Sequence, residues 1–178
     1  MKRYHPLIIA LHWIVAIMVL ISLLLGGPGL AEMDSNDPDK LSGAMGHMIW
    51  GLVVGFFMVV RLITRVNTQN PTKADSGNNL INLGARAAHW CLYLLVLAMV
   101  ATGLGTAISA NLFEIIFGAS GQPFPADIKQ FLPMAAHGII ATLLVILIGL
   151  HVLGWAYHQF ILRDGLLSRM WFGKRKVD

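Results

Sequence analysis

The sequence predicts an all-α protein, a bundle of four transmembrane helices. Three observations predict this fold class: 56% of the 178 residues are hydrophobic, only 12% are charged, and the mean hydropathy is +0.67. These values lie far from those of a soluble domain of the same length. The apolar residues gather in four stretches, and none of them alternates as a barrel strand would. No internal repeat divides the chain, so we expect one domain over residues 1–178.

Each apolar stretch is near the ~20 residues that a helix needs to cross the hydrocarbon core. The first stretch follows Lys2 and Arg3, a start that it shares with secretory signals. Its apolar run is longer than the usual ~7–15 residues of a signal and contains His12 and Trp13, so we interpret it as a retained helix. The expected helices cover about residues 7–26, 44–64, 87–108 and 134–162.

The segments between these helices are polar and carry turn signals. Residues 67–82 are expected to form a loop on the side of the two termini, and residues 27–43 and 109–133 are expected to form loops on the opposite side. Within the last of these, NLFEIIFG predicts a short helix on the membrane surface that ends near Gly118. The side chain of Asn111 is its expected N-cap.

Basic residues distribute unevenly between the two sides of the expected bundle. By the positive-inside rule the richer side faces the cytoplasm, so both termini are expected there and the two opposite loops in the periplasm of a bacterial cell. The inward surplus underlies the net charge of +4 and could also touch anionic lipid around residues 173–176, although an orientation signal is the simpler interpretation. The outward side holds Lys40 and Lys129, and the inward side holds Lys2, Arg3, Arg61, Arg65, Lys73, Arg86, Arg163, Arg169, Lys174, Arg175 and Lys176.

Cys91 is the only cysteine in the chain. A covalent haem attachment of the C-x-x-C-H type and metal clusters held by several thiolates are therefore excluded. Any haem must be bound without a covalent link, through side chains such as histidine. The apolar stretches supply that residue type repeatedly.

Histidines recur inside the expected helices, where a polar ring costs free energy unless it finds a partner. His137 and His151 lie 14 residues apart in the fourth helix, which places them on one face and ~21 Å apart along the axis. His47 enters the second helix at its outer end, level with His137, so these two residues are the expected outer pair. Glycines that leave room for a large flat cofactor beside these positions are Gly46, Gly51, Gly55, Gly138, Gly149 and Gly154.

The inner partner of His151 stays open on spacing alone. His12 lies 14 residues before Gly26, and His89 lies 14 residues before Gly103, so both fall near the depth of His151. Two neutral imidazoles that face each other across a gap suit a six-coordinate haem iron, whereas zinc and copper centres gather three or four ligands at one point. The competing interpretation is a set of polar rings that only bridge helices by hydrogen bonds.

Other polar residues near the inner level are candidates for supporting roles. Arg61 could neutralise a haem propionate. A role as an interfacial arginine that snorkels and helps to set the topology is an interpretation of at least equal weight. Arg86, His89 and His158 could bind a quinone on the inner side, or Trp50 and the outer loops on the other, since a quinone pocket needs little beyond an apolar slot and one or two donors. His158 falls seven residues after His151, and we favour a snorkelling residue near the inner interface.

Four segments carry the motifs of a known family. They are LHWIV at residues 11–15, GHMIWG and MVVRLITR within residues 46–65, AAHWCLYLL at 87–95 and IGLHVLGWAYH at 148–158. With these motifs the chain resembles the prokaryotic cytochrome b561 family, which is related to the membrane cytochrome b subunits of nickel–iron hydrogenases and formate dehydrogenases. The resemblance implies two b-type haems, the inner one on His12 and His151 and the outer one on His47 and His137. It leaves His89 beside the ligands or in a quinone site.

The resemblance implies electron transfer across the bacterial inner membrane by two haem b groups, with ubiquinone as a bound substrate and lipid as the surroundings. A close relative is understood to oxidise superoxide on the outer side while it reduces quinone. In this chain the outward loops carry six carboxylates against two lysines, which weakens the case for an anionic substrate because a positive funnel would attract one. The carboxylates are Glu32, Asp34, Asp37, Asp39, Glu114 and Asp127.

Two other functions are compatible with the sequence. The chain could be a membrane anchor that relays electrons from a periplasmic oxidoreductase partner to quinone, which its short loops and small size would suit. It could also be a transporter or a structural bundle without haem, although midplane charge is then expected and Arg61 is a weak candidate for it. We expect no nucleic acid among its partners.

Overall fold

The computed structural model describes residues 3–35, 37–72, 74–118 and 120–173, and over these residues it contains helices and no strands. Four helical spans are long and apolar enough to cross a membrane, which confirms the fold class. Residues 174–176, part of the segment considered for lipid contact, lie outside the described residues. So do five of the basic residues that enter the orientation prediction: Lys2, Lys73, Lys174, Arg175 and Lys176.

The second and third membrane spans begin well ahead of their apolar stretches because polar residues cap these helices. The Asp37 carboxylate accepts the N–H of Asp39 at 2.8 Å, and the Asn78 side chain accepts the N–H groups of Leu80 and Ile81. The helices therefore begin in polar sequence, ahead of the apolar pattern. The first span joins α1 (Pro6–Ile21), the π-helical turn η1 (Ser22–Gly26) and α2 (Gly27–Glu32); the others are α3 (Pro38–Asn67), α4 (Asn79–Ser109) and α6 (Leu132–Ala156) with its π-helical extension η3 (Tyr157–Leu162).

Two expectations about the outward segments are wrong in detail. Residues 27–43 were expected to form a loop, but they are helical through α2 and again from Pro38. The short helix is confirmed as α5 (Leu112–Phe117), yet Asn111 does not cap it with its side chain. Asn111 instead has a left-handed φ of 52°, and its side-chain amide donates to the Glu114 carboxylate at 2.8 Å.

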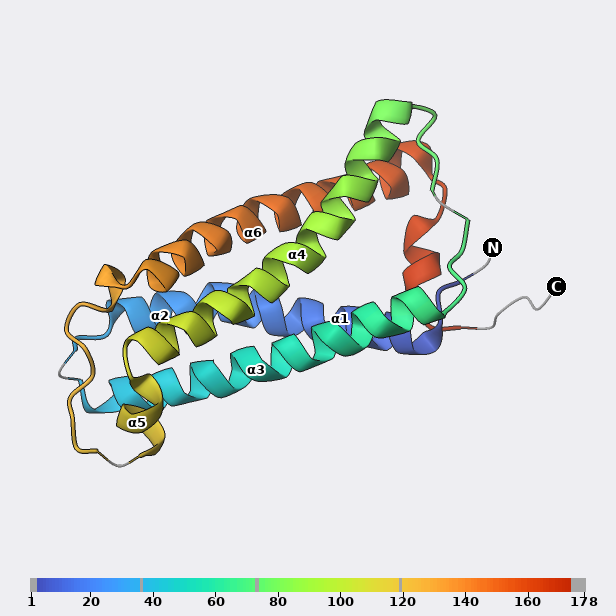
Figure 1. The fold of residues 1–178 in the computed structure, drawn as a ribbon. Helices are drawn as coiled ribbons and strands as arrows, with labels where there is room; N and C mark the ends of the chain where they lie inside the picture. Colours follow the sequence, from blue (N-terminus) through green and yellow to red (C-terminus); the bar gives the residue numbers. More distant parts are fainter. Residues whose placement is uncertain (1–2, 36, 73, 119, 174–178) are drawn as a thin grey trace.

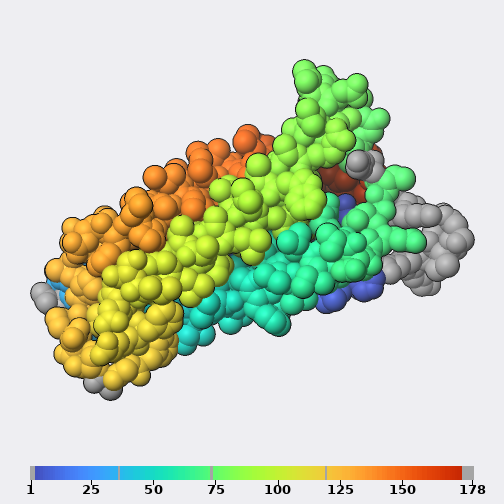
Figure 2. All heavy atoms as spheres, viewed as in Figure 1, coloured from blue at the N-terminus to red at the C-terminus, as the bar shows by residue number. Residues whose placement is uncertain are grey.

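The long helices pack as two pairs that are joined along one side. α4 packs against α6, α1 against α3, and α3 also against α4 (Figure 1). Figure 2 shows α4 between α6 and α3 on the face in view, and toward its first residues α4 diverges from α3 and leaves a recess. Large apolar side chains such as Leu24 and Leu94 are exposed on the outside of the bundle, as a lipid-facing surface requires. The core consists of Val15, Met18, Val19, Val54, Met58, Tyr93, Val96 and Leu144.

The two ends of the bundle are closed by different segments. The C-terminal segment with η4 (Leu166–Met170) lies beside the start of the chain, because Trp13 Nε1 donates to the Met170 carbonyl at 2.9 Å and the Tyr4 N–H donates to the Arg169 carbonyl at 3.1 Å. We call this the inner end, and both described chain ends lie there (Figure 1). At the opposite, outer end, α5 closes the bundle through a second apolar cluster of Ala107, Ala110, Leu112 and Ile115.

A leucine at Gly55 should destabilise the bundle. A Cβ at this position would lie 3.1 Å from both Cγ atoms of Val100 on α4, so a larger side chain must push α3 and α4 apart. Overpacking of this kind typically costs about 1–3 kcal/mol. We expect Gly55→Leu to unfold at a lower temperature in detergent than Gly84→Leu, in which the added Cβ meets open space. Equal unfolding midpoints would contradict the close contact of α3 with α4.

Candidate functional site

His47 on α3 and His137 on α6 face each other near the outer end of the bundle. Their ring centres are 6.2 Å apart, and the ring planes are inclined by 75°. Gly26 makes room for one ring, because a Cβ there would lie 3.1 Å from His47 Nδ1, whereas a Cβ at Gly103 would make an ordinary contact with His137 Cε1 at 3.5 Å. The fold thus brings together the two residues of the expected outer pair.

A cavity of about 710 Å³ surrounds these two rings. Its size falls within the range of about 300–1,000 Å³ that is typical of ligand and cofactor sites. Apolar side chains from all four spans form its walls, and Gly51 and Gly103 reduce the bulk beside the histidines. Toward the outer end, the lining is mixed in charge and includes Glu32, Asp34, Asp127, Lys40 and Lys129.

Three histidine rings gather at a second level, nearer the inner end. His12 on α1 and His151 on α6 have ring centres 6.4 Å apart and planes inclined by 63°. His89 on α4 is closer to His151, with ring centres 5.2 Å apart and planes inclined by 88°. Both candidates that spacing left open therefore lie beside His151.

The distance between ring centres decides which of these pairs could hold a metal ion between the two rings. A ring nitrogen binds a transition-metal ion at about 2.0–2.1 Å and lies about 1.1 Å from its ring centre, so two rings on opposite sides of one ion have centres about 6.2–6.4 Å apart. His47 with His137 and His12 with His151 have this separation, whereas His89 is too close to His151. Among the described residues no three His, Cys, Asp or Glu side chains converge on one point. The two pairs therefore fit a haem iron held from both faces.

His89 is bound to its own helix rather than placed opposite His151. Its Nδ1 lies 2.6 Å from the carbonyl of Ala85, one turn earlier on α4. The residue is exposed on the surface of the bundle. His89 is thus a neighbour of the inner pair.

Arg61 lies inside the bundle at the inner level. Its terminal NH2 group is 3.2 Å from His12 Nδ1, and its guanidinium lies over the Tyr93 ring at 4.8 Å. Its Nε is buried and has no hydrogen-bond partner among the described residues. Arg61 therefore does not snorkel, since its charged group points into the bundle. Arg86, the other candidate cation, is exposed near the start of α4.

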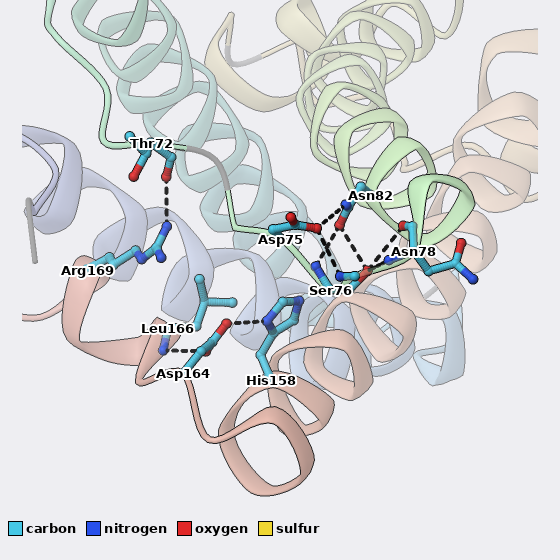
Figure 3. Close-up of polar contacts among 10 residues, drawn as sticks. Thr72, Asp75, Ser76, Asn78, Asn82, His158, Asp164, Leu166 and Arg169 are labelled. Atoms are coloured by element: carbon cyan, nitrogen blue, oxygen red, sulfur yellow. Dashed lines mark hydrogen bonds and ion pairs between the residues drawn. The ribbon is translucent and has the colours of Figure 1, made fainter.

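His158 is buried, with 8% of its surface exposed, which contradicts the expected snorkelling. Its Nδ1 lies 2.6 Å from one carboxylate oxygen of Asp164, whose other oxygen accepts the Leu166 N–H at 3.0 Å (Figure 3). The π-helical η3 and the left-handed Arg163, with φ of 51°, turn the chain so that Asp164 meets the ring. The sequence pattern did not indicate Asp164, because a partner six residues later is not at helical spacing.

The loop between α3 and α4 is held by its own polar side chains and by the C-terminal segment. Asn82 Nδ2 donates to the Asp75 carboxylate at 2.7 Å (Figure 3). This bond and the N–H of Gly77 hold the pKa of Asp75 below its ordinary value, so the carboxylate stays charged at neutral pH. Arg169 donates to the carbonyl of Thr72 at 2.7 Å. The inner end is therefore a connected polar layer.

Known proteins are similar to this chain over nearly its full length. The sequence model of the family described as prokaryotic cytochrome b561 matches residues 3–173. The chain is 26% identical to "Probable superoxide oxidase CybB" of Yersinia pestis over 98% of both chains, and 28% identical to "Cytochrome b561 homolog 2" of Escherichia coli strain K12 over 99% of this chain and 95% of the other. It is also 26% identical to "Cytochrome b562" of Cereibacter sphaeroides over 94% of both chains. With a family model that spans almost every described residue, the chain belongs to the prokaryotic cytochrome b561 family.

Proposed function

We propose that this chain is a di-haem b-type cytochrome that transfers electrons across the bacterial inner membrane and exchanges them with ubiquinone. The observation that supports the proposal is the presence of two opposed imidazole pairs in one bundle, with ring centres 6.2 and 6.4 Å apart. Membership of the family implies haem b binding and electron transport. The four apolar spans and the family together make the chain a multi-pass inner-membrane protein.

In this proposal His47 and His137 hold the outer haem, and His12 and His151 hold the inner one. When bound, haem b supplies one-electron chemistry at an iron whose potential depends on its ligands and surroundings. The chain itself orients the rings, excludes water with apolar walls and separates the two levels by ~21 Å along α6. One centre then lies toward each face of the membrane.

We place both termini on the cytoplasmic side. The described chain ends lie at the inner end, and so do the cationic side chains that follow the membrane parts of α3 and α6, such as Arg65 and Arg163. A surplus of cations marks the cytoplasmic side of membrane proteins. The cavity around His47 and His137 then opens toward the periplasm.

Arg61 would bind a propionate of the inner haem. A guanidinium can only donate hydrogen bonds, so beside Arg61 the Nδ1 of His12 must accept. A histidine that binds iron through Nε2 carries its proton on Nδ1 and cannot accept there. Arg61 must therefore turn away from His12 when the ring binds iron, and a carboxylate is the acceptor that a guanidinium pairs with best.

His158 and Asp164 are the residues that we place at a quinone site on the inner side. Reduction of a quinone to a quinol consumes two protons, and a histidine held by a carboxylate is suited to deliver one. Two further polar atoms nearby in the sequence, Trp155 Nε1 and Gln159 Oε1, are buried without a hydrogen-bond partner among the described residues. A quinone headgroup offers carbonyl oxygens that a ring N–H can bind.

The electron donor on the outer side has two candidates. The relative from Yersinia pestis is named a probable superoxide oxidase. The charged outer part of the cavity lining, which we call the cavity mouth, contains Lys40 and Lys129, which would attract an anion. The same mouth contains Glu32, Asp34 and Asp127, which oppose an anion and favour relay from a periplasmic redox protein. The second candidate function is therefore an electron-relay subunit of a periplasmic oxidoreductase.

Purified protein should contain two b-type haems per chain, measured as the pyridine haemochrome against protein concentration. Replacing either residue of a pair by alanine should reduce this ratio to one, because the remaining ring leaves the iron without its second axial ligand. His89→Ala is the matched control and should retain both haems. Loss of a haem from His89→Ala, with His12→Ala unaffected, would show instead that His89 is the partner of His151.

Variants of the inner polar pair should slow quinone chemistry without loss of haem. We expect His158→Phe and Asp164→Asn to lower the rate at which ubiquinone reoxidises the dithionite-reduced protein by about tenfold or more, since a positioned proton donor contributes roughly 10²–10⁴-fold. Tyr157→Phe changes the neighbouring side chain and serves as the control. Unchanged rates in both variants would place the quinone elsewhere.

Neutralising the cavity mouth should accelerate reduction by superoxide if superoxide is the donor. We expect Glu32→Gln combined with Asp34→Asn to increase the initial rate of haem reduction in superoxide pulses roughly twofold to tenfold at low salt. Asp39→Asn with Glu114→Gln removes the same charge outside the cavity lining and should have a smaller effect. If superoxide reduces neither the native protein nor the variants, the relay function is supported.

A further inference from the structure

Thr102 on α4 contacts the ring of His137 from the neighbouring helix. Its Oγ1 lies 3.1 Å from His137 Nδ1, 2.8 Å from the Ala98 carbonyl and 3.1 Å from the Met99 carbonyl. α4 and α6 are closely packed against each other, so the two backbones fix the distance between hydroxyl and ring. Gly103, the next residue, also lies against the ring, since a Cβ there would be 3.5 Å from His137 Cε1.

The directions of these hydrogen bonds follow from the donors that are present. A hydroxyl has one proton and two lone pairs, and a helical threonine commonly donates to the carbonyl four residues earlier. The shortest contact of Thr102, to Ala98, is of this kind. A lone pair of Oγ1 then faces His137, so the ring donates from Nδ1 and leaves Nε2 without a proton.

We infer that Thr102 is a positioning residue that holds His137 in the tautomer and orientation required of an iron ligand, and that it thereby tunes the outer haem. The inference rests on the proposed function, because it concerns a haem on His47 and His137. Histidines that bind metals commonly donate their second ring N–H to an acceptor, which orients the ring and raises its basicity. Thr102 supplies such an acceptor from a different helix, next to the Met99 carbonyl, which also interacts with the ring.

The inner rings are partnered in other ways. His12 Nδ1 faces a donor, Arg61, and His89 Nδ1 faces the Ala85 carbonyl of its own helix. The contact between Thr102 and His137 therefore sets the outer level apart from the inner one. Its removal should change one haem and leave the other as it is.

Thr102→Val removes the acceptor and nearly preserves the shape of the side chain. A less basic His137 stabilises the ferric state less, so the midpoint potential of the outer haem should rise while that of the inner haem stays unchanged. Retention of the outer haem should weaken by about tenfold, the lower end of the effect seen when such acceptors are lost. Thr102→Ser restores the hydroxyl and should return both properties toward the native values.

The experiment is a redox titration of the purified full chain, followed at the haem absorbance, for native protein, Thr102→Val, Thr102→Ser and Thr142→Val. The component that is absent from His47→Ala identifies the outer haem. Thr142→Val is the matched control, because Thr142 bonds the Gly138 carbonyl on α6 and is exposed. Haem retention is measured by the haemochrome ratio after dilution into haem-free detergent.

The inference is supported if Thr102→Val alone raises the outer potential and Thr102→Ser does not. It is overturned if Thr102→Val leaves the outer potential unchanged, or if Thr102→Ser or Thr142→Val shifts it equally, which would indicate a packing effect. Native protein that lacks an outer haem would refute the proposed function and the inference together. Native protein with both haems and no response to Thr102→Val would refute the inference alone.

Discussion

The structure depends on the cost of placing polar imidazole rings inside an apolar bundle. A ring nitrogen in hydrocarbon must find a partner, and His12, His47, His137 and His151 are half-buried among apolar side chains. Each of these rings lies beside another, with ring centres 6.2 or 6.4 Å apart, a separation that would admit a metal ion between them. Gly26 and the cavity around the outer rings leave space at that level.

The packing of the helices reflects the same requirement. α6 supplies one ring to each level. Yet only 6% of the most apolar part of its span is buried inside the chain, compared with 33% for the first span. α6 contacts α4 closely, and its two histidines lie beside His12 on α1 and His47 on α3. Under the proposed function, two macrocycles would provide the packing that α6 lacks against α1 and α3, so haem binding would also stabilise the bundle.

The pattern of apolar stretches and the spacing of histidines were sufficient to predict the four spans and to bring His47 together with His137. Both follow from regular helix geometry, in which 14 residues return to one face. For the inner level spacing left His12 and His89 open as partners of His151, and only the family resemblance favoured His12. Helix ends were not predictable from hydropathy, because caps such as Asp37 and Asn78 lie in polar sequence. The contact between His158 and Asp164 depends on a π-helical end and a left-handed residue, and the inward turn of Arg61 depends on Tyr93 from another helix. Neither leaves a periodic signal.

The two levels differ in their electrostatic surroundings. Under the proposed function, each difference would favour placing an electron at the inner level rather than at the outer level. If the pairs hold haem as proposed, Arg61 turns from His12 to a propionate of the inner haem, offsets its negative charge and so favours the reduced state there. At the outer level the cavity lining carries Glu32, Asp34 and Asp127 against Lys40 and Lys129, and this surplus of negative charge would oppose an added electron. The hydrogen bond that we infer from His137 to Thr102 would favour the oxidised state. Under the proposed function the inner centre would therefore have the higher affinity for an electron, and electrons entering from the outer side would move down in free energy toward the end of the bundle where His158 contacts Asp164.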